Sequence, residues 1–270
     1  MDYGKFKQGT IIHGLRSEQY RGAPCSAVII TAECDIAQCK VSKFYYLTAM
    51  DVRTWMKTEG AAYARDSKQL TQLKKFIEDF SDKLPGPAEY RNAATIDLED
   101  LEAGIRALPE TGDTTAALET LSRITSIEPT NKDILGCLKQ VFNGSLTQYF
   151  FIPRSAYIGK KKEDLKPEDF CEGLIVNFQD ISYFDAATVS MIERQKMDFE
   201  KLSPTDRERY NHVFFLEDKD AIIFPEHAIS SPYRERLMQA FSSAFIRIGV
   251  DFDSKAAKDY WDRALREPAQ

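Results

Sequence analysis

The chain has 270 residues, of which 43% are hydrophobic and 29% are charged. This composition is typical of a soluble globular protein, and no apolar run approaches the roughly 20 residues that a membrane-spanning helix needs. The net charge of −6 argues against a broad nucleic-acid surface, because such surfaces are basic.

The five cysteines are an odd number at irregular spacing, which favours a reducing compartment over a disulfide framework. The first ten residues lack the apolar core of a signal peptide. We therefore expect a cytoplasmic protein that makes no membrane contact.

Three short strands are predicted first, at 9–15, 27–31 and 44–49, because each is rich in β-branched or aromatic residues and is bounded by polar loops. The character changes at Asp51. Apolar residues then recur at helical spacing, as at Leu70, Leu73 and Ile77. The helices predicted in this block lie within 52–80, 97–108, 113–127 and 130–142. Thr130 and Asp133 are placed to cap the last of them.

Strand character returns after these helices, at 147–153, 171–178 and 181–184, and in a hairpin of 212–216 with 221–224. A helix is predicted from Ser231 to Gly249, and a last exposed helix at 255–265. We therefore predict an α+β fold. A small β-barrel is built from residues 1–50 and 147–250, with a helical insertion at 51–146 and a tail helix at 251–270. Two sequential domains are the alternative, but three strands alone are marginal as an independent unit.

A candidate binding site lies where the second strand ends. Thr31, Cys34, Asp35 and Lys40 follow one another closely there, and a rigid strand would hold them while a loop exposes them. Asp35 and Lys40 could pair and shape a binding notch. In the purely structural alternative, Asp35 only stabilises the turn after the strand. Trp261, in the tail helix, is a candidate partner contact because aromatic anchors suit interfaces.

The cysteines suggest two other kinds of site. Cys25, Cys34 and Cys39 could bind zinc with His13, or Cys34 could act as a nucleophile beside a histidine. Neither spacing matches a known signature, and free cysteines are common in protein cores. We therefore expect structural thiols, with no metal and no other cofactor.

Four stretches resemble the MazF/PemK toxin family: Gly9–Ile12 (GTII), Cys25–Thr31 (CSAVIIT), Phe44–Thr48 (FYYLT) and Ile175–Asp185 (IVNFQDISYFD). This resemblance implies an SH3-like barrel and metal-independent cleavage of single-stranded RNA. It also implies a homodimer, unless the insertion covers that face. The helical block is not part of the resemblance.

The sequence departs from the family at its catalytic arginine. The family carries an arginine ahead of the second strand, where this chain has Cys25 or Ser26, and a hydroxyl at the end of the third strand, where it has Thr48. We therefore expect a catalytically degenerate module whose helical insertion binds a bacterial protein partner, as a regulatory subunit in a stress or phage-defence system. The alternative is an endoribonuclease that binds RNA and uses Thr48 with Arg16 or Arg21.

Overall fold

The computed structural model describes the following residues: 6–17, 19–20, 23–38, 40–80, 98–194, 197–198, 203–210, 213–214, 222–223, 225 and 228–247. The predicted tail helix at 251–270 lies outside these residues, as does most of the hairpin predicted at 212–224. None of the described helices combines the length and the apolar character that a membrane crossing needs.

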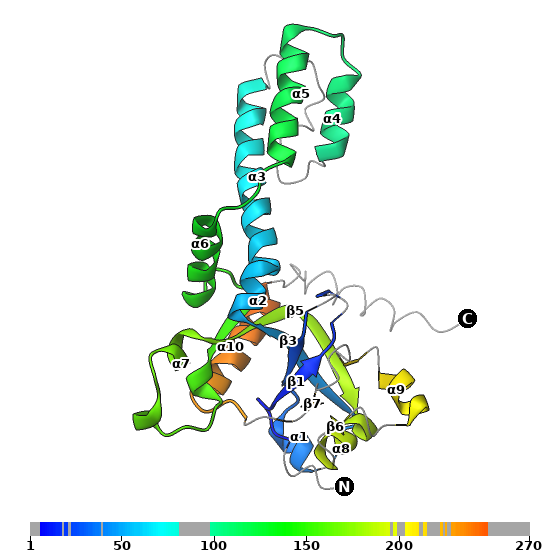
Figure 1. The fold of residues 1–270 in the computed structure, drawn as a ribbon, viewed down its shortest axis with the longest axis vertical. Helices are drawn as coiled ribbons and strands as arrows, with labels where there is room; N and C mark the ends of the chain where they lie inside the picture. The colour runs from blue at the N-terminus through cyan, green and yellow to red at the C-terminus, as the bar shows by residue number, and fades with distance from the viewer. Residues whose placement is uncertain are drawn as a thin grey trace, which may run out of the picture.

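A five-stranded antiparallel sheet forms the centre of the fold (Figure 1). Its strand order is β1-β2-β3-β5-β4. The strands are β1 (Ile11–Leu15), β2 (Cys25–Ile29), β3 (Lys43–Asp51), β4 (Tyr149–Pro153) and β5 (Gly173–Asp185). Because β3 hydrogen-bonds to β5 along most of its length, the prediction that early and late strands build one sheet is confirmed.

Both faces of the sheet are buried over most of their area, although Tyr45, Ile181 and Tyr183 are exposed where the start of β3 meets the end of β5. Phe44, Tyr46 and Met50 of β3 belong to one hydrophobic core, and the intervening Leu47 and Ala49 belong to another. Helices α2 (Val52–Lys57), α6 (Asn131–Phe142) and α8 (Ala186–Arg194) pack on the strands beside the first core, and α10 (Tyr233–Arg247) contributes to the second. A strand that is buried on both faces reads as an almost continuous apolar run, which is how these strands appear in the sequence.

The predicted α+β class is confirmed, but the predicted barrel is not. Strands β1 and β4 are the two edges of the sheet and do not pair with each other among the described residues. The outer side of β1 instead meets single bridges, from Ile12 to Pro225 and from Leu15 to Phe214. A barrel buries one sheet face by closing around it, whereas helices cover both faces of this sheet, so burial does not require closure.

A helical block separates β3 from β4. It contains α2 (Val52–Lys57), α3 (Glu59–Phe80), α4 (Leu98–Arg106), α5 (Gly112–Thr125) and α6 (Asn131–Phe142). Asp51 caps α2 by accepting the backbone N–H groups of Arg53 and Thr54. The predicted capping box of Thr130 and Asp133 is confirmed at the start of α6.

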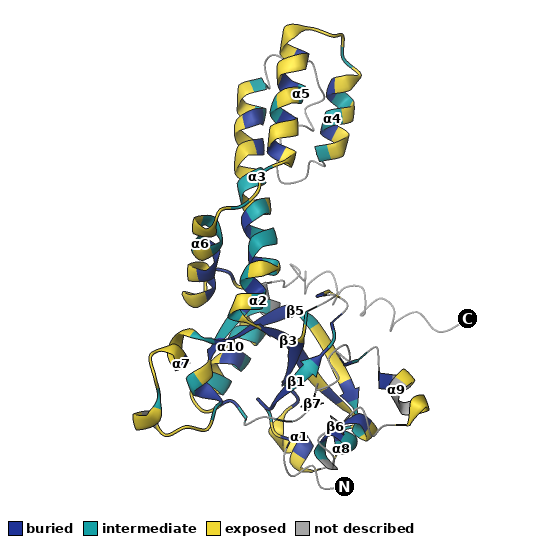
Figure 2. Cartoon of the chain, viewed as in Figure 1, coloured by how far each residue is buried: buried dark blue, intermediate teal, exposed yellow. Residues whose placement is uncertain are grey.

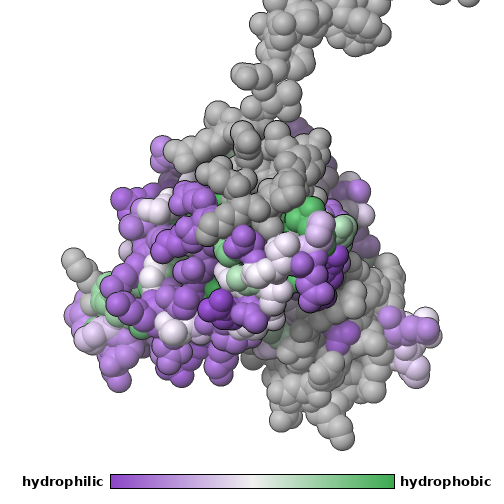
Figure 3. Space-filling model, turned by 90° about the horizontal axis from the view of Figure 1, so that it is seen from above, coloured by the Kyte–Doolittle hydropathy of each residue, from purple (hydrophilic) through white to green (hydrophobic). Residues whose placement is uncertain are grey.

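Helices α3, α4 and α5, which we call the arm, project away from the sheet (Figure 1). The far half of α3 packs against α4 and α5 through a separate hydrophobic core that includes Phe76, Leu101, Ile105 and Leu121. Buried positions along the arm lie between exposed ones (Figure 2). Helix α6 lies back against α3 near the sheet. Seen from above along the arm, the described surface is mainly hydrophilic with scattered hydrophobic spots (Figure 3).

The remaining elements are short. They comprise α1 (Glu33–Ala37), η2 (Arg154–Ala156), η3 (Lys162–Asp164), α7 (Glu168–Cys171), α8 (Ala186–Arg194), α9 (Pro204–Tyr210) and a small sheet of β6 (Met197–Asp198) with β7 (Ile222–Ile223). An ion pair of Arg234 with Glu33, 3.3 Å apart, links α10 to α1.

Candidate functional site

A large bulge in β5 opens the sheet beside Thr48. Leu47 lies opposite Ile181 and Ala49 lies opposite Val176, so the single residue Thr48 faces the four residues 177–180. Extra residues in one strand bend it and redirect its side chains. The two strands predicted at 171–178 and 181–184 are therefore one strand, and the turn predicted between them is this bulge.

Asn177 of the bulge makes an internal polar contact. It is buried, and its side-chain N–H donates to the hydroxyl of Tyr20, while its oxygen accepts the backbone N–H of Gln179 at 2.8 Å. Burial raises the pKa of Tyr20, so the phenol stays protonated at neutral pH. These bonds fix the bent conformation of β5.

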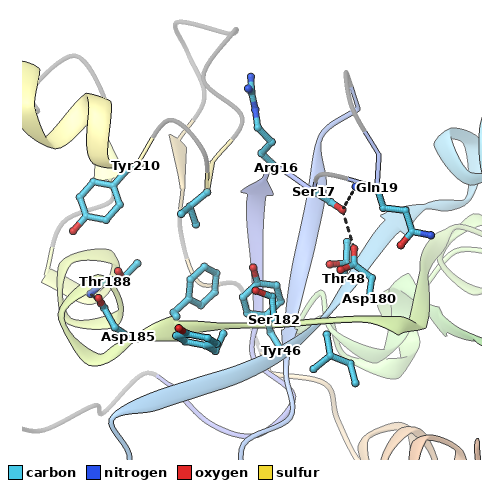
Figure 4. Close-up of a pocket in the computed structure, with 14 residues that line it drawn as sticks. Arg16, Ser17, Gln19, Tyr46, Thr48, Asp180, Ser182, Asp185, Thr188 and Tyr210 are labelled. Carbon is cyan, nitrogen blue, oxygen red and sulfur yellow. Dashed lines mark hydrogen bonds between the residues drawn. The ribbon is translucent and has the colours of Figure 1, made fainter.

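Asp180, at the end of the bulge, lies in a pocket of about 630 Å³ with Thr48 and Arg16 (Figure 4). The hydroxyl of Ser17 donates to the Asp180 carboxylate at 2.8 Å, and the backbone N–H of Gln19 donates to the same hydroxyl at 3.2 Å. Ser17 and Gln19 follow β1, so the loop after β1 is held over the bulge of β5.

Tyr46 and Ser182 supply hydroxyl groups to this pocket. They lie opposite each other on β3 and β5. Burial is the main cause that raises the pKa of Tyr46, and the nearby Asp180 carboxylate raises it further, although a hydrogen bond with Ser182 opposes them. The Tyr46 hydroxyl therefore keeps its proton at neutral pH and can donate a hydrogen bond.

The pocket carries more negative than positive charge. Asp180 and Asp185 are its described carboxylates, and Arg16 is the one cation among its described lining residues. Asp185 also accepts the backbone N–H of Thr188 at 2.7 Å, at the start of α8. The Arg16 side chain extends away from the sheet, whereas Thr48 lies on the sheet and is 1% exposed (Figure 4).

The structure divides the predicted site residues into two groups. Thr48 and Arg16 line the same pocket, as the ribonuclease alternative requires. Arg21 and Trp261 lie outside the described residues. The structure adds Asp180 and Tyr46, which the sequence did not single out. The sequence pattern that could have identified Asp180 is the polar pair Gln179-Asp180, which interrupts an apolar strand.

The residues predicted at the end of β2 do not line this pocket. The hydroxyl of Thr31 accepts the backbone N–H of Tyr45 at 2.7 Å and so extends the ladder between β2 and β3. Cys34 and Asp35 are exposed on α1. Lys40 donates its backbone N–H to the Asp35 carbonyl at 3.2 Å. These contacts stabilise the turn after the strand.

The described cysteines do not assemble a metal site. Cys25 is buried in the sheet and Cys34 is exposed on α1, while Cys39 lies outside the described residues. No group of three or more His, Cys, Asp or Glu side chains is placed to hold a metal ion in the described part of the chain. Burial raises the pKa of Cys25 to about 12, so this thiol is not a nucleophile at neutral pH.

No family model, no curated protein and no solved structure matches the chain.

Proposed function

We propose that this protein is a catalytically degenerate interaction module, and that the arm is its main surface for a protein partner. The observation that carries the proposal is the separate hydrophobic core of α3, α4 and α5. An arm that is stabilised by its own core can present its outer faces to a partner without disturbing the sheet. At roughly 1.5 Å per residue, the 22 residues of α3 span about 33 Å.

The charge of the arm indicates what kind of partner would fit it. The charges on α3 balance, with four acidic and four basic side chains. Helices α4 and α5 carry the excess acid: Asp100, Asp113 and Glu119 are exposed there, while Arg106 is paired with Glu102 and Arg123 is the other basic residue. Opposite charges across an interface speed association and fix its register. We therefore expect a protein partner with a basic surface.

The proposed ancestry is a divergent MazF/PemK-like barrel that has opened and gained the helical block. What supports it is that the three early strands share one sheet with β5, which pairs with β3. In the same proposal the protein works in the bacterial cytoplasm as a regulatory subunit of a stress or phage-defence system. The charge of the pocket supports the loss of catalysis. Its two carboxylates outnumber its one arginine, so they would repel the negatively charged phosphodiester of an RNA substrate.

The test is an affinity purification of the tagged chain from its source organism, with quantitative mass spectrometry. The double variant Asp100→Lys/Glu119→Lys reverses two charges on the arm, and the control Asp164→Lys reverses one charge at an exposed site away from the arm. We expect one stoichiometric protein partner that the double variant loses and the Asp164→Lys control keeps. Recovery of no such partner, or equal recovery by all three proteins, would contradict the proposal.

A second function, ribonuclease activity, is favoured by one observation, the shared pocket of Arg16, Thr48 and Asp180. In this mechanism Asp180 takes the proton of a ribose 2′-hydroxyl, whose oxygen attacks phosphorus as the bond to the 5′-oxygen breaks. Water then protonates the leaving 5′-oxygen. Arg16 would balance the charge on the phosphate, and Thr48 would donate a hydrogen bond.

Expression in bacteria separates the two functions. A ribonuclease should arrest growth on strong induction, and Arg16→Ala or Thr48→Val should restore growth at equal protein level. Thr48→Val keeps the shape of the buried side chain while removing the hydroxyl. Unaffected growth with abundant folded protein would exclude this second function.

A further inference from the structure

The outer edge of β4 carries no strand partner among the described residues, because β4 pairs with β5 on one side only there. The Phe178 N–H donates to the Gln148 carbonyl at 2.9 Å, and the Arg154 N–H donates to the Glu172 carbonyl at 2.7 Å. Antiparallel pairing alternates, so Phe150 and Ile152 bond to β5. The N–H and C=O of Phe151 then point outward, and no described group hydrogen-bonds to them.

A groove of about 660 Å³ runs beside this edge. The end of α6 forms one wall, with Phe142, and α10 forms the other, with Tyr233 and Arg236 spaced at one helical turn. Phe170 of α7 also lines it. Phe142 is 47% exposed and Phe170 is 51% exposed, which is unusual for side chains of this size that lie close together around one groove.

The charge of the groove narrows the class of ligand. Among the described lining residues Arg236 is the only charged one, and it stands among aromatic and neutral side chains. A carboxylate on the ligand would meet a guanidinium there with no described acidic competitor. The Phe142 ring already packs on the Phe151 ring, with their centroids 4.5 Å apart. An apolar side chain of the ligand would therefore extend an existing aromatic contact.

We propose that this groove binds an extended peptide segment of a partner protein, which adds to the sheet as a strand beside β4. The peptide would exchange backbone hydrogen bonds with Phe151, place apolar side chains against Phe142 and Phe170, and set an acidic side chain or its terminal carboxylate on Arg236. Strand addition takes affinity from main-chain bonds and specificity from such side-chain contacts. Pro153 has no N–H and limits the paired length to a few residues.

This proposal does not depend on the arm, because the groove lies between α6, β4 and α10. The two surfaces can therefore be tested separately. The charge reversals on α4 and α5 leave the groove unaltered, and the groove variants leave the outer face of the arm unaltered.

The experiment selects ligands for the full-length chain from a phage-displayed library of random 12-residue peptides. We expect the selected peptides to share alternating apolar residues with an Asp or Glu. Arg236→Glu and Phe142→Ser should each weaken binding of a selected peptide by at least tenfold. Leu135→Ser, which changes a leucine that is equally exposed on the same helix but outside the groove, should leave binding unchanged.

Amide hydrogen exchange measured by NMR tests the strand addition itself. A bound peptide should slow exchange of the Phe151 amide and leave the Phe150 and Ile152 amides, which already bond to β5, unchanged. The proposal is overturned if no peptide is selected, if binding ignores both groove variants, or if the Phe151 amide stays unprotected. It is also overturned if the chain forms a dimer that Arg236→Glu dissociates, because the occupant would then be a second copy.

Discussion

Gly60→Ala should destabilise the protein, although the same substitution usually stabilises a helix. Gly60 is the second residue of α3, and an added Cβ would lie 2.7 Å from Cζ3 and 2.8 Å from Cε3 of Trp55. It would also lie 3.0 Å from the Trp55 carbonyl oxygen. The Trp55 ring is fully buried between the sheet and the arm, so it cannot move away without disturbing its neighbours.

Two opposing effects set the change in the free energy of unfolding that Gly60→Ala causes. Replacing glycine by alanine within a helix gains about 0.5–1 kcal/mol, and forcing an extra methyl group into a packed core costs about 1–3 kcal/mol. We expect the free energy of unfolding to fall by about 1–2 kcal/mol. Gly136→Ala in α6 is the matched control, because nothing lies within 4 Å of its added Cβ. It should gain about 0.5–1 kcal/mol.

Urea denaturation followed by tryptophan fluorescence measures both variants. The chain has two tryptophans, so Trp261→Phe in every protein leaves Trp55 as the only indole. With a slope of about 2 kcal/mol per M, the Gly60→Ala midpoint should fall by about 0.5–1 M and the Gly136→Ala midpoint should rise slightly. If Gly60→Ala raises the midpoint as its control does, the close packing of Trp55 against α3 is refuted.

Three further predictions concern single contacts. Thr31→Val should lower the free energy of unfolding by about 1 kcal/mol, because the Tyr45 N–H loses its acceptor, whereas Thr31→Ser should retain stability in the same urea titration. Tyr149→Phe should cost about 1–2 kcal/mol, because the Tyr149 hydroxyl donates to the Glu59 carboxylate at 2.6 Å and so joins the sheet to α3. Hydrogen bonds from the backbone and hydroxyl of Thr130, and then from Lys68, lower the pKa of Asp133 from 3.8 to about 2. The stability that the ionised Asp133 carboxylate contributes is therefore fully present above about pH 4 and is lost as the pH falls toward 2. The midpoint of thermal unfolding should therefore fall further between pH 5 and pH 2.5 in the wild type than in Asp133→Asn.

Sequence patterns predicted the local elements of this fold better than their assembly. The strands of the central sheet and the helices between β3 and β4 follow from apolar spacing, and the Thr130 cap follows from local chemistry. Closure of the sheet could not be predicted in this way. Whether β1 pairs with β4 depends on what covers the sheet faces, and α10 and the helices on the opposite face lie far from β1 in the sequence.

The bulge of β5 shows the same limit within one strand. Gln179 and Asp180 interrupt an apolar run, and such an interruption predicts a turn as readily as a bulge. The two outcomes differ only in whether Ile181 continues to pair with β3, and it does, opposite Leu47. The pocket therefore exists because β3 holds both halves of β5, which is a long-range contact that no spacing within 171–184 encodes.

Two threonines show why the candidate site was only partly predictable. Thr31 follows one buried strand and Thr48 lies near the end of the next, and both side chains are largely buried. The Thr31 hydroxyl faces a backbone N–H of the neighbouring strand, and satisfying that donor is its role. Thr48 faces a bulge that supplies four residues where a regular strand would supply one. The bulge and Thr48 line a pocket, although the Thr48 side chain is itself only 1% exposed. The same residue type therefore satisfies a backbone donor in one place and forms part of a pocket wall in the other.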